Sequence, residues 1–139
     1  MGLSDKIYRN AAFELETNAD GNVDTVKGDC LYRLVTGGFE MVYKEDSTET
    51  RVRLTAECVE FERKGEQSYK MTVLPQKQTQ TVMTTPYGKL ELTVEGEDML
   101  YMPMQHGFDA VFRYFMQTGP EQERVHMTVA LRVKFDKQK

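Results

Sequence analysis

The sequence contains no tryptophan, only two cysteines and two histidines, and no long hydrophobic run. Without such a run the chain has no candidate for a membrane-spanning helix, which needs about 20 consecutive apolar residues. Cys30 and Cys58 lie far apart in alternating segments. This favours a buried, reduced pair over a disulfide or a metal site. His106 and His126 belong to no motif with metal-ligand spacing, so we expect no metal and no cofactor.

Basic residues are too few for a general nucleic-acid binder. The formal net charge is −4 and the isoelectric point is near 5.3, whereas proteins that bind phosphate backbones usually carry a basic surplus. The first six residues, MGLSDK, lack the apolar core of a signal peptide. We therefore expect a cytoplasmic protein that binds neither nucleic acid nor membranes.

The composition is that of one globular domain. The chain has 139 residues, of which 40% are hydrophobic, and it includes seven tyrosines and seven phenylalanines. This is enough material for a substantial core. No linker, internal repeat or low-complexity run divides the chain, so we expect a single β-barrel domain over residues 1–139.

Hydrophobic and polar residues alternate with a period of two almost everywhere, which is typical of half-buried strands. The clearest example places Val52 and Leu54 on one face and Arg51 and Arg53 on the other. Similar patterns predict strands near residues 7–15, 26–34, 39–45, 49–56, 59–61, 69–73, 76–85, 89–94, 108–118 and 123–135. For residues 97–106 the pattern predicts a longer connection with at most a short helical turn.

Short turns join these strands. Asp20-Gly21 supplies the positive φ angles that a tight hairpin needs, and Gly37-Gly38 and Lys64-Gly65-Glu66 mark two further hairpins. Consecutive hairpins with short loops favour an up-and-down meander, and closure removes its exposed edges. The predicted fold class is all-β, an antiparallel up-and-down barrel of about 8–10 strands.

Several landmarks resemble a known family. They are Gly28 within a strand, Tyr43-Lys44-Glu45 at the end of the third strand, the segment PYGKLEL at 86–92, and the aromatic strand around Tyr114. In this order and spacing they resemble the YwiB-like family of small bacterial proteins, over about residues 13–133. The resemblance implies a lipocalin-like (calycin) fold and carries no activity with it.

The sequence shows no catalytic constellation. There is no Gly-x-Ser-x-Gly elbow and no phosphate-binding glycine loop. Cys58 precedes Val59-Glu60-Phe61, a strand pattern rather than the surroundings of a reactive thiol. We expect a protein that is not an enzyme.

Two sets of residues are candidates for the mouth of the barrel. If Phe39, Met41 and Tyr43 point inward, Glu45 continues that series at the rim, where its carboxylate can bind a ligand; the alternative is that Glu45 lies in the turn. On strand 108–118, Arg113 either points inward, where a guanidinium can hold a carboxylate, or outward. The resemblance implies that Tyr114 points inward, which favours Arg113 outside.

The segment 97–106 carries Leu100, Tyr101 and three methionines, at 99, 102 and 104, an unusual composition for a connection. Methionine-rich surfaces adapt to varied apolar partners. The segment is either a mobile surface at the mouth or a plug or extra strand packed on the barrel. The complete set of candidate ligand-binding residues is Tyr43, Glu45, Tyr87, Leu100, Met102, Met104 and Tyr114.

Two functions remain open at this stage. The first is a non-enzymatic binder or carrier of a small apolar or amphiphilic ligand. The second is a protein-interaction or structural module whose barrel is filled by its own side chains, since barrels of about eight strands can be hollow or filled. Strand 108–118 is apolar on both faces. Its outer face therefore needs cover, either from segment 97–106 or from a second subunit in a homodimer.

Overall fold

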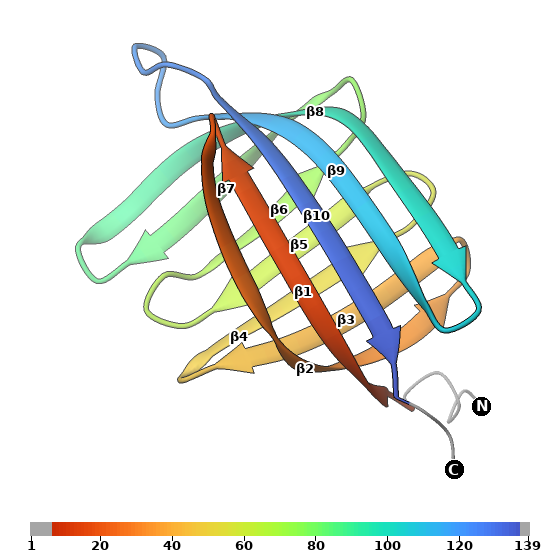
Figure 1. The fold of residues 1–139 in the computed structure, drawn as a ribbon. Helices are drawn as coiled ribbons and strands as arrows, with labels where there is room; N and C mark the ends of the chain where they lie inside the picture. The colour runs from red at the N-terminus through yellow and green to blue at the C-terminus, as the bar shows by residue number, and fades with distance from the viewer. Residues whose placement is uncertain (1–6, 137–139) are drawn as a thin grey trace.

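The computed structural model describes residues 7–136 as ten antiparallel strands joined in sequence (Figure 1). They are β1 (Arg9–Ala19), β2 (Asn22–Val35), β3 (Gly38–Glu45), β4 (Thr48–Leu54), β5 (Val59–Lys64), β6 (Tyr69–Val73), β7 (Gln78–Thr85), β8 (Gly88–Met104), β9 (Gly107–Gln117) and β10 (Val125–Phe135). Residues 7–136 contain no helix with the length and apolarity needed to cross a membrane.

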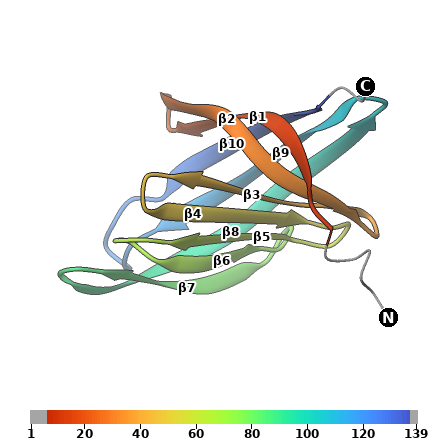
Figure 2. The same cartoon turned by 90° about the horizontal axis from the view of Figure 1, so that it is seen from below.

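The strands form one sheet in the order β6-β5-β4-β3-β2-β1-β10-β9-β8-β7. Pairing of β1 with β10 joins the first and the last strand, and the sheet curls into a nearly closed barrel. Figure 2 shows β1, β2 and β10 on one side of this barrel and β5, β6 and β7 on the other. The predicted all-β, up-and-down architecture is confirmed.

The barrel closes along a sparse seam between β6 and β7. Instead of a continuous ladder, isolated bridges join Ser68 to Thr84 and Pro75 to Gly96. The Thr79 hydroxyl also donates a hydrogen bond to the carbonyl oxygen of Thr72. Because few backbone hydrogen bonds cross the seam, we infer that it is the weakest part of the wall.

The predicted inward faces are largely correct. The most deeply buried side chains include Phe39, Met41, Val52, Val59, Val94, Phe108, Ala110 and Phe112, each at most 1% exposed. The rings of Phe39 and Phe108 lie 4.2 Å apart, and Phe13 and Tyr43 lie 4.4 Å apart. The chain's own side chains thus occupy this part of the interior, which leaves the ends of the barrel for any ligand.

The first hairpin has the tight turn that the sequence predicts. Asp20 and Gly21 have φ angles of 51° and 95°, the left-handed conformation that a two-residue hairpin turn requires. The Asn18 side chain accepts a hydrogen bond from the backbone N–H of Gly21 at 2.7 Å. The turn therefore fixes the register of β1 against β2.

The prediction of a connection at 97–106 was wrong, because these residues continue β8 to Met104. A β-bulge between Gly96 and Asp98 inserts one extra residue opposite β9. A bulge reverses which side chains face inward. Before it, Leu92 and Val94 point inward; after it, Met99 and Tyr101 pack against the core.

The bulge explains why the remaining apolar residues of this segment face outward. Leu100, Met102 and Met104 are 55%, 42% and 53% exposed. Tyr101, between them, packs its ring 5.6 Å from Phe39 and 5.9 Å from Phe108. The segment is therefore neither a mobile loop nor a plug but part of the barrel wall.

Replacing Tyr101 with serine should lower the free energy of unfolding by about 3 kcal/mol, because aromatic contacts with the core are lost. Met102→Ser, one residue further along, should change it by less than about 1 kcal/mol, because Met102 faces outward. Urea unfolding of both variants measures the difference. A greater loss in Met102→Ser would contradict the position of the bulge.

Candidate functional site

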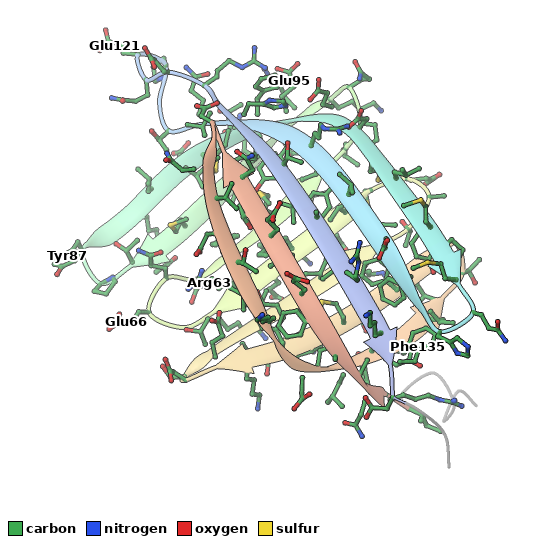
Figure 3. The ribbon with its side chains drawn as sticks, viewed as in Figure 1. Arg63, Glu66, Tyr87, Glu95, Glu121 and Phe135 are labelled. Carbon is green, nitrogen blue, oxygen red and sulfur yellow. The ribbon has the colours of Figure 1, made fainter. Side chains whose placement is uncertain are left out.

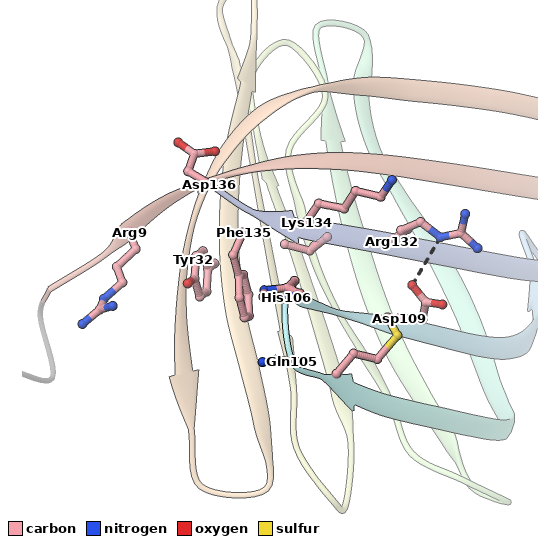
Figure 4. Close-up of a pocket in the computed structure, with 12 residues that line it drawn as sticks. Arg9, Tyr32, Gln105, His106, Asp109, Arg132, Lys134, Phe135 and Asp136 are labelled. Atoms are coloured by element: carbon pink, nitrogen blue, oxygen red, sulfur yellow. Dashed lines mark hydrogen bonds and ion pairs between the residues drawn. The ribbon is translucent and has the colours of Figure 1, made fainter. Parts of the chain in front are cut away.

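An open groove lies at one mouth of the barrel, where β10 ends beside the β8–β9 turn (Figure 4). Its volume is about 1130 Å³. Tyr32 and Phe135 stack with ring centroids 4.5 Å apart and interplanar angle 8°, and Val133 lies beside them. We call this the mouth groove, and its full lining is Arg9, Tyr32, Met104, Gln105, His106, Gly107, Asp109, Arg132, Val133, Lys134, Phe135 and Asp136.

Alternation along the strands produces the apolar part of the mouth groove. Val133 and Phe135 are consecutive inward positions at the end of β10, where the core reaches the rim. Tyr32 occupies an inward position on β2, opposite Arg9 of β1. The backbone N–H of Phe135 donates to the carbonyl oxygen of His106 at 2.8 Å, which ties the β8–β9 turn to the end of β10.

Charged side chains surround this apolar surface. Arg132 pairs with Asp109, with its Nε 3.3 Å from the carboxylate, and Figure 4 shows this pair on the rim. Arg9 and Lys134 add two cationic groups, and Asp136 adds an anionic one. An apolar floor with charges of both signs at its edge suits a small molecule that has an apolar body and a polar head.

The titratable groups beneath the mouth groove remain neutral near pH 7. Burial raises the pKa of Tyr32, although the charge of Arg9 opposes this. Burial, with a smaller contribution from Asp136 and Asp29, raises the pKa of the Cys30 thiol to about 12. A thiol with so high a pKa is a poor nucleophile. Both cysteines are free thiols as predicted, but Cys58 is half-buried rather than buried.

The structure separates the candidate ligand-binding residues into different regions. Among them, only Met104 lines the mouth groove. Leu100 lies outward on the β8 wall, and Met102 borders a shallow depression there. Tyr87, at the tip of the β7–β8 hairpin, is 99% exposed.

Tyr43 and Tyr114 are inward and buried, as predicted. Glu45 ends β3 opposite Thr48, where it is exposed, and its charge contributes to the raised pKa of Tyr43. Glu45 thus lies at the hairpin end of β3 and not in the interior. Figure 3 shows Glu66 and Tyr87 on hairpins at the opposite side of the molecule from Phe135.

Arg113 points outward, as favoured above, and its guanidinium contacts both carboxylate oxygens of Asp98 at 3.1 Å. Phe115, on the outer face of β9, is covered from within the chain. Phe115 stacks on His126 with ring centroids 4.6 Å apart, and the Arg124 guanidinium lies 4.1 Å from the Phe115 ring centre. Side chains of β10 and the adjoining loop thus cover Phe115, and a second subunit over the rest of this face stays a prediction.

Arg63, which the sequence analysis missed, is an inward-facing arginine. It continues the inward series of Val59 and Phe61 along β5. Its Nε atom is buried and has no hydrogen-bond partner among the described residues. The sequence pattern would have predicted this orientation if the strand at 59–61 had been extended by two residues, up to the Lys64-Gly65-Glu66 turn.

A second charged cluster lies on the outer face of β2, β3 and β4. Glu40 is only 6% exposed and accepts hydrogen bonds from the Tyr8 hydroxyl and from Nε of Arg33, the latter at 2.9 Å. Arg51 and Arg53 approach it at 3.5 and 3.6 Å. Tyr8 also accepts a hydrogen bond from Arg51. This arrangement clamps the start of the described chain onto the sheet.

Burial by itself raises the pKa of Glu40, but the hydrogen bonds from Tyr8 and Arg33 and the nearby positive charges lower it overall, below 4.5. The stability that Glu40 contributes is therefore present above the pKa of the unfolded chain and is lost as the pH falls through the lower, folded-state value. Glu40→Gln should lower the free energy of unfolding at pH 7 by about 1–3 kcal/mol. Urea unfolding from pH 7 to pH 3 should show this difference from the wild type shrinking, and a constant difference would contradict the ionic role.

No group of three or more His, Cys, Asp or Glu side chains that could hold a metal ion occurs within residues 7–136.

Comparison with known proteins assigns the chain to a family. Residues 11–129 match the model of a family described as a domain of unknown function, DUF1934. The chain belongs to this family. A search of curated proteins found no match.

The DUF1934 chain also resembles a solved structure, the crystal structure of the ywiB protein from Bacillus subtilis. The two have a TM-score of 0.79 and 14% sequence identity, over 98% of this chain and 100% of that one. At this identity the likeness supports the shared fold. The resemblance to the YwiB-like family seen in the sequence is confirmed.

The family match covers only part of the mouth groove. Tyr32 and the β8–β9 turn lie within residues 11–129 of this DUF1934 domain, whereas Arg9 and the stretch Arg132–Asp136 lie outside them. Most of the charged rim and Phe135 therefore lie outside the residues that match the family model.

Proposed function

We propose that this protein is a non-enzymatic binder of a small amphiphilic ligand, which it holds in the mouth groove. The observation that carries the proposal is the apolar floor of Tyr32 and Phe135 within an open volume of about 1130 Å³. Pockets for small molecules typically have volumes of about 300–1,000 Å³, mostly apolar linings and a few polar groups. The ligand's apolar part would lie on the aromatic pair and its polar head near Arg9 or Lys134.

The absence of enzymatic activity is part of the proposal. The buried Cys30 stays protonated because its pKa is raised to about 12. Asp109, on the rim, is engaged by Arg132. The groove thus supplies contacts for binding, and its nearest thiol and this carboxylate are poorly placed for nucleophilic or general-base chemistry.

A fluorescent fatty acid should bind with micromolar affinity, about −8 kcal/mol. Phe135→Ser should weaken binding at least tenfold, because the buried aromatic contact is worth more than about 1 kcal/mol. Met104→Ser should weaken it less, and Leu90→Ser, an exposed apolar residue on the β7–β8 hairpin, serves as the control that leaves it unchanged. Fluorescence titration measures all three, and a fully folded protein with no saturable binding would contradict the proposal.

A second candidate rests on the outer wall of β8, where Leu100 and Met102 are 55% and 42% exposed beside the half-buried Val111. We propose it as the contact surface of a homodimer, since clustered exposed apolar residues often mark an interface. Sedimentation velocity of the wild type and of Leu100→Lys tests this. A wild-type dimer that the variant converts to monomer supports the interface, and a wild-type monomer at high concentration excludes it.

A further inference from the structure

Four inward-facing polar positions form a row across β3, β4, β5 and β6. Tyr43 pairs with Thr50, Thr50 pairs with Arg63, and Arg63 pairs with Tyr69 in the strand register. Residues directly opposite each other on one face of a sheet have their Cβ atoms about 4.5–5.5 Å apart. The row therefore brings a guanidinium, two phenols and a hydroxyl together inside the barrel. Figure 3 shows Arg63 near the Glu66 and Tyr87 hairpins, away from Phe135 and the mouth groove.

Arg63 is the unusual member of this row. Its Nε–H is buried without an acceptor, and no carboxylate of residues 7–136 forms an ion pair with it. A buried donor without a partner destabilises the folded state, and more so when it is charged. Such a cost is rarely retained unless a partner is present in some state of the protein.

The neighbouring tyrosines cannot act as counterions. Burial raises the pKa values of Tyr69, Tyr43 and Tyr114, so that all three hydroxyls are protonated near pH 7. The charge of Arg63 opposes the rise in pKa of Tyr69 and Tyr43 without reversing it, and for Tyr69 a hydrogen bond from the Arg63 side chain acts in the same direction. The hydroxyls are instead available to donate hydrogen bonds to an anion that approaches the guanidinium.

Other charges near the row do not neutralise Arg63. Glu45 is close enough to affect Tyr43, but it is exposed at the end of β3. Glu62 and Lys64 flank Arg63 on β5, and by the alternation of the strand they face the opposite side of the sheet. Across the seam, on β7, the buried Thr81 hydroxyl likewise has no hydrogen-bond partner among the described residues.

We propose that Arg63 is the anchor of a second binding site, in which the guanidinium and the Tyr69 hydroxyl hold the carboxylate of a small organic acid. The planar guanidinium can form two parallel hydrogen bonds to a carboxylate, a geometry that a lysine ammonium cannot reproduce. Arg63 is half-buried, so part of its side chain is open to solvent. The sparse β6–β7 seam lies next to Tyr69 and gives the wall room to adjust. This site is independent of the mouth groove.

The test is an NMR titration of ¹⁵N-labelled protein with sodium butyrate at constant ionic strength. We expect the Arg63 Nε–H resonance to shift and to saturate. The Arg113 Nε–H resonance should stay in place, because that guanidinium already pairs with Asp98. Tyr69→Phe, which keeps the ring and removes the hydroxyl, should weaken butyrate binding severalfold, and Arg63→Lys at least tenfold.

A second measurement separates ligand binding from a structural role. Without butyrate, Arg63→Met should melt at or above the wild-type temperature, because it removes a charge buried without a counterion. Butyrate should raise the melting temperature of the wild type and leave Arg63→Met unchanged. A melting temperature of Arg63→Met well below the wild type would assign Arg63 to the fold and overturn the proposal.

Two further outcomes of the titration are decisive. If the Arg63 resonance responds to sodium chloride as strongly as to butyrate, the guanidinium does not recognise a carboxylate and the proposal is wrong. If the resonance does not respond to either salt, only water occupies the site and the proposal is also wrong. Binding of the fluorescent fatty acid in the mouth groove should be the same in Arg63→Met and in the wild type. Failure of one site is thereby distinguishable from failure of the other.

Discussion

Gly96→Ala should lower the free energy of unfolding by about 3 kcal/mol or more, since a Cβ atom at this position would overlap the carbonyl oxygen of Leu74. Gly96 lies where the end of β6 crosses β8, and its carbonyl oxygen and N–H bond to the backbone of Gln76 and Lys77, both at 3.0 Å. Nothing flexible can move aside, because the obstacle is backbone. The substitution therefore separates the two chain segments that close the barrel.

Gly28→Ala is the matched control for this prediction. A Cβ at residue 28 would meet only the Phe13 ring, at 3.9 Å, which is ordinary contact. We expect a change within about 1 kcal/mol, because alanine also reduces the entropy of the unfolded chain. Urea unfolding compares the two variants, and equal stability would show that the contact at Gly96 does not hold the barrel closed.

Val129→Asp should destabilise the protein by about 3–5 kcal/mol, because it buries a charge without a partner. Val129 is 3% exposed on the inner face of β10. Thr128→Asp should cost less than about 1 kcal/mol, since residue 128 lies on the outer face, opposite Arg113 in the register. Equal losses on urea unfolding would mean that the register of β10 against β9 is wrong.

The alternation of apolar and polar residues was sufficient to predict these strands and faces. It correctly predicted the strand near 123–135 and the shared face of Val52 and Leu54, and Asp20-Gly21 correctly marked a tight turn. Both signals are local: a period of two depends on neighbouring residues, and a hairpin turn depends on the φ angles of two of them. Joining such hairpins in sequence gives the order of β1 to β6 and of β7 to β10, whereas the pairing of β1 with β10 connects the two ends of the strand sequence.

The same reasoning failed where a contact distant in sequence decides the structure. The bulge at Gly96 coincides with the approach of Leu74, and nothing in the local pattern marks it. The bulge turns Leu100, Met102 and Met104 outward, so that of the candidate ligand-binding residues only Met104 lines the mouth groove. The Glu40 clamp and the cover over Phe115 likewise depend on pairs of strands.

The proposed binding site was only partly predictable. Met104 was a candidate because its segment is rich in methionine, whereas Tyr32 and Phe135 fell within the predicted strands 26–34 and 123–135 and were not candidates. They form a groove because β2 and β10 end at the same mouth of the barrel, which a strand pattern does not reveal. Arg63, in contrast, could have been predicted to face inward, because it continues the alternation of Val59 and Phe61 to the end of β5.

Methyl NMR of the methionines gives the most direct test of binding in the mouth groove. The chain has nine methionines, including Met104 in the groove and the buried Met41 and Met71 in the interior. On titration of the Arg63→Met variant, which lacks the second carboxylate site, with dodecanoate at constant ionic strength, the account predicts a saturable shift of the Met104 methyl and stationary resonances for Met41 and Met71. Saturable shifts of Met41 and Met71, with Met104 unmoved, would place the ligand inside the barrel and contradict the account.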